Sequence, residues 1–412
     1  MKSSFLKEMK SRGYLNQCTD LDGLDQICNK EHIIGYIGFD STANSLHVGS
    51  LLQIMILRLL QKHGHQPIIL LGGGTTLIGD PSGKDSTRKL LTEKDIKKNI
   101  SGIKKNFLKL LNFKNKKTQP IFVNNLSWLK KLNYIDFLRE IGIQFTINKM
   151  LTFDSVKLRL DREQSLSYME FNYMILQAYD FLMLNKKNKC VLQLGGSDQW
   201  GNIINGVELV RRISKTEVYG LTSPLITLTS GAKMGKTEKG AVWLDEKKFS
   251  PYEYWQFWRN TDDNDVKKFL KFFTDIELNE IEKICNEESN VNKLKILLAN
   301  EATKILHGKK KSLECENTAL ETFKFGKVGK NLPEIKINIL DLKKGISILD
   351  LLSKNKILNS KSEARRMILN KGIKINEQII NERRLLDLND FNKVKNIKLS
   401  LGKKRHYILK KN

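Results

Sequence analysis

Apolar and polar residues in the first half of the chain follow two alternating patterns. Short apolar runs, typical of strands buried on both faces, fall at residues 33–39, 68–71, 121–123 and 190–194. Residues 46–62, 134–140, 167–184 and 203–213 instead place apolar side chains at helical spacing. Strands that alternate with helices predict an α/β fold with a doubly wound parallel sheet.

Ligands in such sheets bind at the carboxyl ends of the strands. Each predicted strand in this chain ends in glycine or polar residues. The last one leads into Gly-Gly-Ser-Asp-Gln-Trp-Gly at residues 195–201, where an acid and an amide follow a tight turn. We therefore expect a site for a sugar or another polar ligand at this edge. The other strand ends are Gly38-Phe39-Asp40, Gly72-Gly73-Gly74 and Asn124-Asn125.

The second half of the chain has a different pattern. After a lysine-bearing loop at residues 230–240, the stretch 251–325 has helical spacing with almost no glycine or proline, which predicts an α-helical domain. Residues 326–344 are rich in glycine and lysine and predict a linker. We place the domains at 1–245, 246–325 and 345–412.

The segment 345–412 reads as a small, basic α+β domain. Ser360 and Glu363 form a capping-box pattern that opens a helix through Leu369, and we expect Gly372 to end it in a left-handed conformation. Strand patterns follow at 373–376 and 397–401. The whole chain has 71 Lys and Arg against 45 Asp and Glu, but 57 of the basic residues are lysine, which suggests drift in composition. From residue 341 onward the numbers are 19 and 7, so a charge suited to nucleic acid is concentrated here.

Composition excludes several classes of protein. A chain of 412 residues with 40% apolar content is long enough for two or three globular domains. The amino terminus has no apolar leader and no run is long enough to span a bilayer, so we expect a cytoplasmic protein. Five scattered cysteines predict reduced structural thiols and no metal site.

Two segments are candidates for phosphate binding. Between the first strand and its helix, glycine and His47 occur where backbone N–H groups and the helix dipole attract anions, although a histidine there is often a cap or packing residue. Farther along, Lys233-Met234-Gly235-Lys236-Thr237 carries two lysines that can neutralise a leaving pyrophosphate, unless they are ordinary surface lysines. Neither this segment nor 79–85 has the spacing of a phosphate-binding P-loop.

The helix predicted at 167–184 carries a polar stripe. Tyr173, Gln177 and Asp180 are spaced by four and three residues and therefore share one face. If this face lines a pocket, a hydroxyl, an amide and a carboxylate suit a small zwitterion with a hydroxyl of its own. If it faces water, it has no such role.

These segments together resemble the class I aminoacyl-tRNA synthetases, and among them the tyrosine-specific family. The resemblance rests on the histidine segment, the lysine segment, residues 195–201, Tyr36-Ile-Gly-Phe-Asp, residues 79–84 and residues 173–180, and it covers essentially the whole chain. It implies a Rossmann-like catalytic domain, a helical domain for the anticodon arm, and a C-terminal RNA-binding domain of the S-four type. In the last domain, Lys361, Arg365 and Arg366 would contact RNA.

The resemblance also implies roles at single positions. Tyr36 and Asp180 would hold the substrate hydroxyl, Asp80, Tyr173 and Gln177 its ammonium group, and Gln193 and Gln199 would line the same pocket. Gly38 and Asp40 would meet the phosphates or adenylate, and Gly196 and Asp198 the ribose. Pyrophosphate would be stabilised by Thr42, His47, Lys84, Arg88, Lys233 and Lys236.

Two positions depart from the family pattern. His47-Val48-Gly49-Ser50 places a serine where a second histidine is usual. The Ser50 hydroxyl still donates one hydrogen bond to a ribose oxygen, so we expect activity with a cost in rate. Gly235 and Thr237 stand where many relatives have serines, and we expect both changes to be tolerated.

The implied reaction is activation of L-tyrosine by ATP, supplied with Mg²⁺, followed by transfer to tRNA(Tyr). No protein-bound metal is expected, and relatives imply a homodimer that pairs through residues near 120–165. The alternatives are the tryptophan-specific relative, an adenylyltransferase that does not ligate, and a silent RNA-binding relative. Tyr36 with Asp180 argues against the first, while His47, Asp80, Lys233 and Lys236 argue against silence.

Overall fold

The computed structural model describes the chain outside residues 80–90, 228, 230–233, 238–239, 325–331, 356, 359, 392–395 and 403–404. At 154–155, 236–237 and 323–324 only the backbone is described. The chain divides into two compact units. Unit 1 comprises Met1–Lys236, Ala241–Asp245 and Asp262–Leu294, and unit 2 comprises Thr237–Gly240, Glu246–Thr261 and Lys295–Asn412. Among the described residues, no helix is both long and apolar enough to cross a membrane.

Unit 1 contains a six-stranded sheet in the order β1-β6-β5-β2-β3-β4. All neighbouring strands are parallel except β1 and β6. The predicted α/β class with a mostly parallel sheet is therefore confirmed. The pattern of apolar residues did not reveal β1 or β6. The strands are β1 (Gln17–Cys18), β2 (Ile34–Asp40), β3 (Gln66–Gly72), β4 (Ile121–Asn124), β5 (Leu192–Gly196) and β6 (Tyr219–Ser223).

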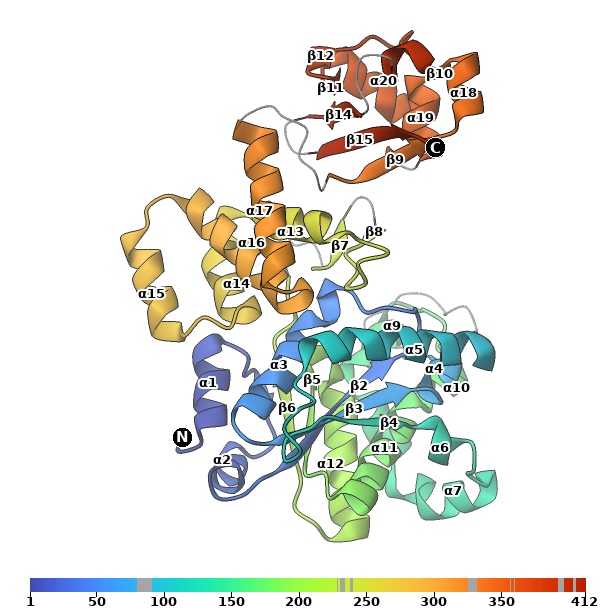
Figure 1. Ribbon diagram of the computed structural model, residues 1–412. Helices are drawn as coiled ribbons and strands as arrows, with labels where there is room; N and C mark the ends of the chain where they lie inside the picture. The colour runs from blue at the N-terminus through green and yellow to red at the C-terminus, as the bar shows by residue number, and fades with distance from the viewer. Residues whose placement is uncertain are drawn as a thin grey trace. The chain divides into compact units, whose positions relative to one another are not determined.

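Helices cover both faces of this sheet (Figure 1). Alternate side chains of β2 explain the two layers: the ring of Phe39 packs against Phe107 of α5 at 4.9 Å between centroids, and the ring of Tyr36 packs against Phe181 of α11 at 5.3 Å. The helices of unit 1 are α1 (Ser4–Arg12), α2 (Leu21–Lys30), α3 (Leu51–Lys62), α4 (Thr75–Ile78), α5 (Glu93–Leu110), α6 (Leu126–Leu129), α7 (Tyr134–Glu140), α8 (Ile147–Leu151), α9 (Asp154–Asp161), α10 (Tyr168–Phe171), α11 (Tyr173–Asn188), α12 (Trp200–Ser214), α14 (Val266–Phe273) and α15 (Leu278–Glu287).

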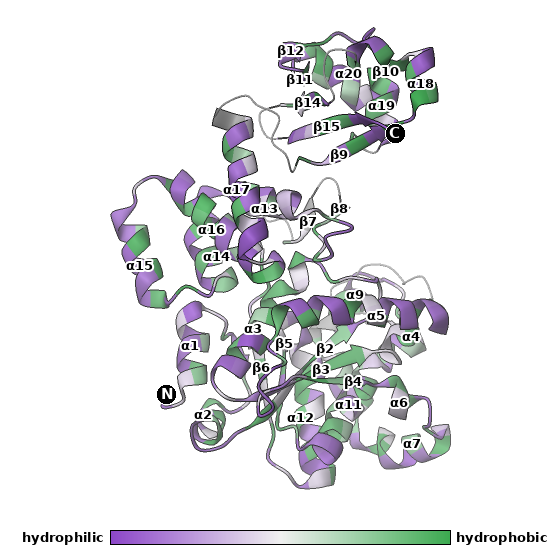
Figure 2. Ribbon diagram, in the orientation of Figure 1, coloured by the Kyte–Doolittle hydropathy of each residue, from purple (hydrophilic) through white to green (hydrophobic). Residues whose placement is uncertain are grey.

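These helices carry hydrophilic and hydrophobic residues side by side along their length, whereas the central strands are mainly hydrophobic (Figure 2). The helix expected at 46–62 begins later than its apolar pattern suggests. His47 caps a short 3-10 turn, η1 (Val48–Ser50), and α3 starts only at Leu51. The backbone around His47 is therefore turned, and the N–H groups of residues 48–51 are bonded within this segment or to Val242.

Unit 2 combines helices with a small sheet of order β12-β11-β14-β15-β9. A core of buried Ile and Leu residues fills the space between this sheet and α19 and α20. The helices are α13 (Pro251–Arg259), α16 (Val291–His307, mostly in this unit), α17 (Lys309–Lys324), α18 (Ile339–Lys344), α19 (Ile348–Lys354) and α20 (Lys361–Leu369). The strands are β9 (Glu334–Ile337), β10 (Ile346–Ser347), β11 (Ile373–Ile375), β12 (Gln378–Ile379), β13 (Leu385–Leu386), β14 (Ile397–Leu401) and β15 (Arg405–Lys411), while β7 (Lys236–Thr237) and β8 (Gly240–Ala241) lie at the boundary between units.

Two expectations for this region need correction. The Ser360 hydroxyl accepts the N–H of Glu363 as predicted, but the left-handed residue after α20 is Lys371, with φ of 54°, and not Gly372. Residues 334–344, expected as linker, form β9 and α18, because β9 pairs in parallel with β15 and so completes the sheet. An isolated four-residue pattern cannot reveal a partner strand that lies 70 residues away.

Candidate active site

A cavity of about 340 Å³ lies at the carboxyl ends of the strands in unit 1. It sits where the chain reverses its direction of winding, since β2 has β3 on one side and β5 on the other. Such switch points are where open parallel sheets bind ligands. The predicted residues that line it are Tyr36, Gly38, Asp40, Ser50, Tyr173, Gln177, Asp180, Gln193, Gly196, Asp198 and Gln199.

The other predicted residues divide into two groups. Thr42 and His47 are described but do not line this cavity. Asp80, Lys84, Arg88 and Lys233 lie outside the described residues, and only the backbone of Lys236 is described. Apart from Asp80, the structure thus brings together the residues expected to meet the amino acid and the ribose, while most of the expected pyrophosphate contacts stay predictions.

Asp180 is the buried carboxylate of the cavity, with 1% of its surface exposed. Its two oxygens accept hydrogen bonds of 2.8 Å from Asn125 Nδ2 and Trp128 Nε1. Burial raises the pKa of Asp180 to about 7 despite these two donors, and the charge of Asp40 adds to the effect. The carboxyl group is therefore fixed in place, and its pKa is well above that of an ordinary aspartate.

Tyr36 lies beside this carboxylate. Its hydroxyl is buried and has no hydrogen-bond partner among the described residues. Burial, and then the charge of Asp180, raise its pKa well above the usual value, so the hydroxyl stays protonated. A buried donor without a partner, next to a carboxylate, costs free energy unless a ligand bonds to it. A ligand hydroxyl that donates to Asp180 and accepts from Tyr36 satisfies both groups.

A second set of polar groups surrounds Asp40. Its Oδ1 accepts from the hydroxyl of Thr75 at 3.0 Å and from that of Tyr173 at 3.4 Å. Two other residues of the cavity lining, Gln177 and Gln199, accept hydrogen bonds through their amide oxygens from Asn202 Nδ2, at 3.0 Å and 3.2 Å. These contacts orient carbonyl and carboxylate oxygens, which are the acceptors that an ammonium group requires.

Sequence reasoning missed several residues of this site. Asn125 holds Asp180 and also donates to Thr75 Oγ1 at 3.0 Å, while its own oxygen accepts the N–H of Gly74 at 2.7 Å. Its place at a polar strand end was the available signal. Gln53 lines the cavity three residues after Ser50, and its buried Oε1 has no partner among the described residues. Nothing in the sequence pattern indicated Trp128.

The glycine at position 38 leaves space for a ligand. A Cβ atom built there would have only the Leu70 side chain within 4 Å, at 3.9 Å. The backbone of β2 is therefore open toward the cavity at this point, as close approach of a phosphate or an adenylate requires.

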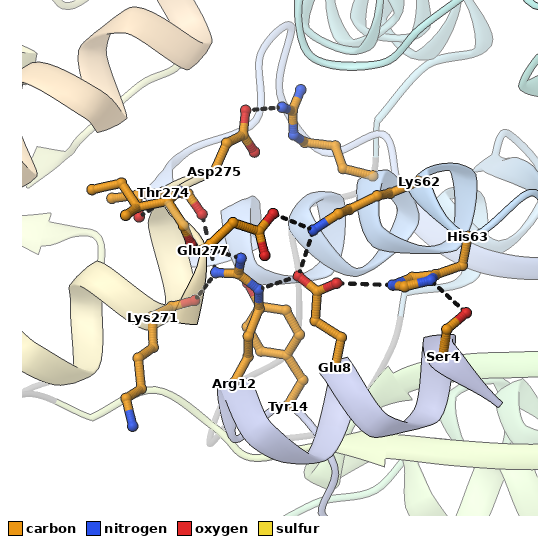
Figure 3. A network of polar contacts seen from close by, with 12 residues as sticks. Ser4, Glu8, Arg12, Tyr14, Lys62, His63, Lys271, Thr274, Asp275 and Glu277 are labelled. Atoms are coloured by element: carbon orange, nitrogen blue, oxygen red, sulfur yellow. Dashed lines mark hydrogen bonds and ion pairs between the residues drawn. The ribbon is translucent and has the colours of Figure 1, made fainter. Parts of the chain in front are cut away.

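A second cavity of about 350 Å³ lies elsewhere in unit 1, between α1, α3 and residues 274–277. The charged side chains around it form hydrogen bonds and ion pairs with one another, as Figure 3 shows for Glu8, Arg12, Lys62 and Glu277. These charged groups bond to one another and do not need a ligand. The cavity at the sheet edge instead contains the buried Tyr36 hydroxyl and Asp180, whose pKa is raised, so we assign the active site to that cavity.

Comparison with known proteins agrees with this site. The family model of class I tRNA synthetases (W and Y) matches residues 28–324. A tyrosine–tRNA ligase of Pelagibacter ubique is 64% identical over 98% of this chain and 98% of that protein, and one of Rickettsia prowazekii is 51% identical over 99% and 100%. A C-terminally truncated mitochondrial tyrosyl-tRNA synthetase of Aspergillus nidulans superposes with a TM-score of 0.70 at 31% identity, over 78% of this chain and 95% of that one.

The chain belongs to the class I tRNA synthetases of the W and Y family, as its fold and the position of its cavity indicate. Its similarity over almost the full length places it, within that family, among the tyrosine–tRNA ligases.

Proposed function

We propose that this protein is the ligase that charges tRNA(Tyr) with L-tyrosine. A carboxylate oxygen of tyrosine attacks the α-phosphorus of ATP, the bond from that phosphorus to the β-phosphate oxygen breaks, and pyrophosphate leaves with the electron pair. The terminal ribose hydroxyl of tRNA then attacks the carbonyl of tyrosyl-adenylate, and AMP leaves. Tyr36 beside Asp180 is the observation that carries the proposal, since a phenolic hydroxyl completes both groups.

Catalysis in this proposal comes from positioning and electrostatics. No nucleophile of the protein is needed, because the substrate supplies its own carboxylate. Asp180 and Tyr36 hold the phenol, and Tyr173, Gln177 and Asp80 hold the ammonium group, with Gln193 and Gln199 alongside. Gly38, Asp40, Gly196 and Asp198 meet the phosphates and the ribose. Thr42, His47, Lys84, Arg88, Lys233 and Lys236 stabilise the ATP phosphates, Ser50 donates to a ribose oxygen, and Mg²⁺ enters with ATP as part of the substrate.

The tRNA contacts belong to unit 2 in this proposal. The basic face of α20 carries the three residues expected to meet RNA. Lys361 pairs with Asp350 at 2.6 Å and Arg365 with Glu382 at 3.7 Å, so both cations are engaged by acids. No ion pair of Arg366 occurs among the described residues. RNA must therefore displace an acidic side chain from Lys361 and from Arg365. This displacement lowers the net contribution of these two residues to the free energy of RNA binding.

We also propose a homodimer that pairs through the surface expected near residues 120–165, and the side chains of residues 134–168 support it. Large apolar side chains in this stretch are exposed, which is unusual for the surface of a monomer. The exposed fraction is 59% at Tyr134, 60% at Ile135, 73% at Ile143, 64% at Ile147 and 66% at Tyr168. Sedimentation equilibrium tests this: Ile143→Lys should shift the mass toward the monomer.

Because tRNA and ATP are used in the cytoplasm, we place the reaction there.

Tyrosine-dependent exchange of labelled pyrophosphate into ATP tests the first step. Exchange should require tyrosine, and neither tryptophan nor phenylalanine should replace it. Asp180→Ala should reduce the ratio of kcat/KM for tyrosine to kcat/KM for phenylalanine in this exchange reaction, because the buried acceptor that rejects phenylalanine is gone. Absence of exchange, or unchanged discrimination in this variant, would contradict the proposal.

A further inference from the structure

Residues 241–244 link the two segments that the proposed function assigns to phosphate binding. We call these residues the connector; all of them belong to unit 1. On one side lie Leu46, His47 and Val48, and on the other lies Gly235, next to the backbone of Lys236. Family resemblance assigned no role to the connector.

Backbone hydrogen bonds join the three segments. The N–H of Val48 donates to the carbonyl of Val242 at 2.9 Å, and the N–H of Leu244 donates to the carbonyl of Leu46 at 2.9 Å. The N–H of Val242 donates to the carbonyl of Gly235 at 3.0 Å. A single residue, Val242, thus bonds to the histidine segment through its oxygen and to the lysine segment through its nitrogen.

Burial makes the connector rigid. Val242 and Leu244 are fully buried, as is Val48 on the histidine segment. Because side chains alternate along extended backbone, Trp243 points to the other side, where it is partly exposed. There its indole and the imidazole of His47 form a T-shaped pair, with ring centroids 6.1 Å apart and planes at 76°.

The imidazole of His47 is held from a second direction as well. Its Nδ1 accepts the N–H of Gly49 at 3.0 Å, so in the neutral ring the proton lies on Nε2. That N–H is a donor suited to a phosphate oxygen. Contact with Trp243 restricts rotation of the ring, which keeps this donor in one orientation.

Gly235 allows the lysine segment to approach the same turn. Its φ is +90°, and a Cβ atom there would lie 2.6 Å from the backbone nitrogen of Gly49 and 3.2 Å from His47 Nδ1. Any side chain at this position would push the two segments apart. The glycine in place of the serine of many relatives is therefore required by this contact, and is more than a tolerated change.

We infer that Trp243 and Gly235 are positioning residues for adenylate formation. Trp243 fixes the imidazole of His47, and Gly235 sets the distance between His47 and the backbone of the lysine segment. Both act through His47, and neither needs to touch the substrate. The inference rests on the proposed function for its kinetic readout.

The first experiment is a double-mutant cycle. Trp243→Leu should lower kcat of tyrosine-dependent pyrophosphate exchange about tenfold and leave the KM for tyrosine unchanged, whereas Trp243→Phe, which keeps a ring edge, should retain most activity. In a His47→Asn background, Trp243→Leu should cost less than about twofold, because the group it positions is already absent. An equal loss in both backgrounds would overturn the inference.

The second experiment uses a matched glycine. Gly240 has φ of +106°, but a Cβ there would meet nothing within 4 Å. Gly235→Ala and Gly240→Ala therefore add similar backbone strain, and only the first adds the collision. Gly235→Ala should lower kcat at least about tenfold, and Gly240→Ala less than about threefold. Equal effects would show that strain alone matters and would refute the role of Gly235.

A spectroscopic readout separates this inference from the proposed function. In protein labelled at its six histidines, the imidazole signal that disappears in His47→Asn belongs to His47. Trp243→Leu should shift that signal, because the nearby indole ring current is lost, and Phe257→Leu, a change at another partly buried ring, should not. Lack of exchange in the wild type would reject the function alone, whereas an unmoved His47 signal in Trp243→Leu would reject the inference alone.

Discussion

At the scale of single residues, the site combines a carboxylate that is costly to ionise with a hydroxyl that has no hydrogen-bond partner in the described part of the chain. Asp180 keeps a pKa of about 7 because burial outweighs its two donors, Asn125 and Trp128. Tyr36 cannot take over the carboxylate's charge, since its own pKa is raised further still. In the proposed function both groups bind the phenol, and a site of this kind rejects a ring that lacks the hydroxyl.

The raised pKa of Asp180 predicts a pH dependence. A carboxyl whose pKa is higher in the folded than in the unfolded state stabilises the fold at low pH, and this stabilisation is lost as pH rises from about 4 through 7. Ionised Asp180 is the better acceptor for the phenol, so kcat/KM for tyrosine should rise with pH through about 7. Asp180→Asn should lack this rise; a wild-type profile flat between pH 6 and 8 would contradict the assignment.

Ser50 predicts a separation between activity and stability. Its hydroxyl lines the cavity but makes no capping hydrogen bond to α3. Ser50→Ala should therefore lower kcat/KM for ATP about fivefold, the value of one hydrogen bond, without changing the unfolding midpoint.

Ser250 is the matched control for Ser50. Its hydroxyl caps α13 in a reciprocal capping box with Glu253. Ser250→Ala should cost about 1 kcal/mol of stability and leave kcat/KM unchanged. If both variants lost activity alike, the role of the Ser50 hydroxyl in binding ATP would be refuted.

Residue roles were accessible from the sequence only where a motif carried them. Tyr173, Gln177 and Asp180 share a face because of helix geometry, and the structure places that face at the cavity. Trp128 and Gln53 are positioned by long-range packing, and a tryptophan or glutamine on a helix has no distinguishing pattern. Contacts between segments 50 to 200 residues apart cannot be deduced from spacing.

At the scale of elements, hydrogen bonds from the N-terminal helix α1 hold the carboxyl end of α14 in place. Arg12 of α1, with 4% of its surface exposed, donates to the carbonyls of Lys271, Thr274 and Ile276, where α14 ends and its carbonyls lack helical partners (Figure 3). The hydroxyl of Tyr14 donates to the Phe272 carbonyl at 2.7 Å. Residues 260 positions apart are thereby joined into one unit.

Loss of Arg12 should destabilise unit 1. Arg12→Ala leaves one buried and two partly buried carbonyls without this donor and removes one of the three donors to the Glu8 carboxylate, so it should cost about 3 kcal/mol, measured as a shift in the urea midpoint. Lys10→Ala, an exposed change on the same helix, should be nearly neutral. Equal midpoints for the two variants would show that the hydrogen bonds of Arg12 contribute nothing to the free energy of unfolding.

The stabilisation that Glu8 provides at this contact between α1 and α14 depends on pH. Burial raises the pKa of Glu8, but hydrogen bonds from His63, Arg12 and Lys62 outweigh it and lower the pKa to about 2. The stabilisation is therefore present above about pH 4.5 and lost as pH falls toward 2. The destabilisation caused by Glu8→Gln should be clear at pH 7 and should shrink below pH 4.5, as followed by thermal unfolding.

Periodicity identified the long elements and misplaced some of their ends. Tyr134–Glu140 and Lys361–Leu369 agree with the predicted helices because their caps lie in the adjacent sequence. The two-residue strand β1 and the edge strand β9 exist only through their partners, β6 and β15. The left-handed residue after α20 is Lys371 and not Gly372, because this backbone conformation favours glycine but does not require it.

At the scale of the whole molecule, the division of labour between adenylate formation and tRNA binding can be tested by truncation. A cut at residue 345 would leave β9 without its partner β15, so the chain should be ended after Lys324. This truncated protein should keep tyrosine-dependent pyrophosphate exchange within about twofold and lose most aminoacylation at limiting tRNA, because the basic segment that neutralises phosphates is gone. Equal loss of both activities would contradict the division.

The class of the molecule was predictable from the sequence, and its division into units was less so. The parallel sheet and the family followed from motifs that occur in a fixed order. Unit 1, however, takes in residues 262–294, which the helical pattern had joined to the second domain; the three domain boundaries stay a prediction.

The pairing of β9 with β15 has a consequence for synthesis. β9 leaves the ribosome about 70 residues before β15, which is its one partner among the described strands of this sheet. Domains generally fold as units during translation, the earlier ones first. The part of unit 2 that contains α20 can therefore complete its sheet only after its last strand has been made, whereas the strands of unit 1 and α14 are already available. A nascent chain of this protein should gain the capacity to activate tyrosine before it gains the capacity to hold tRNA.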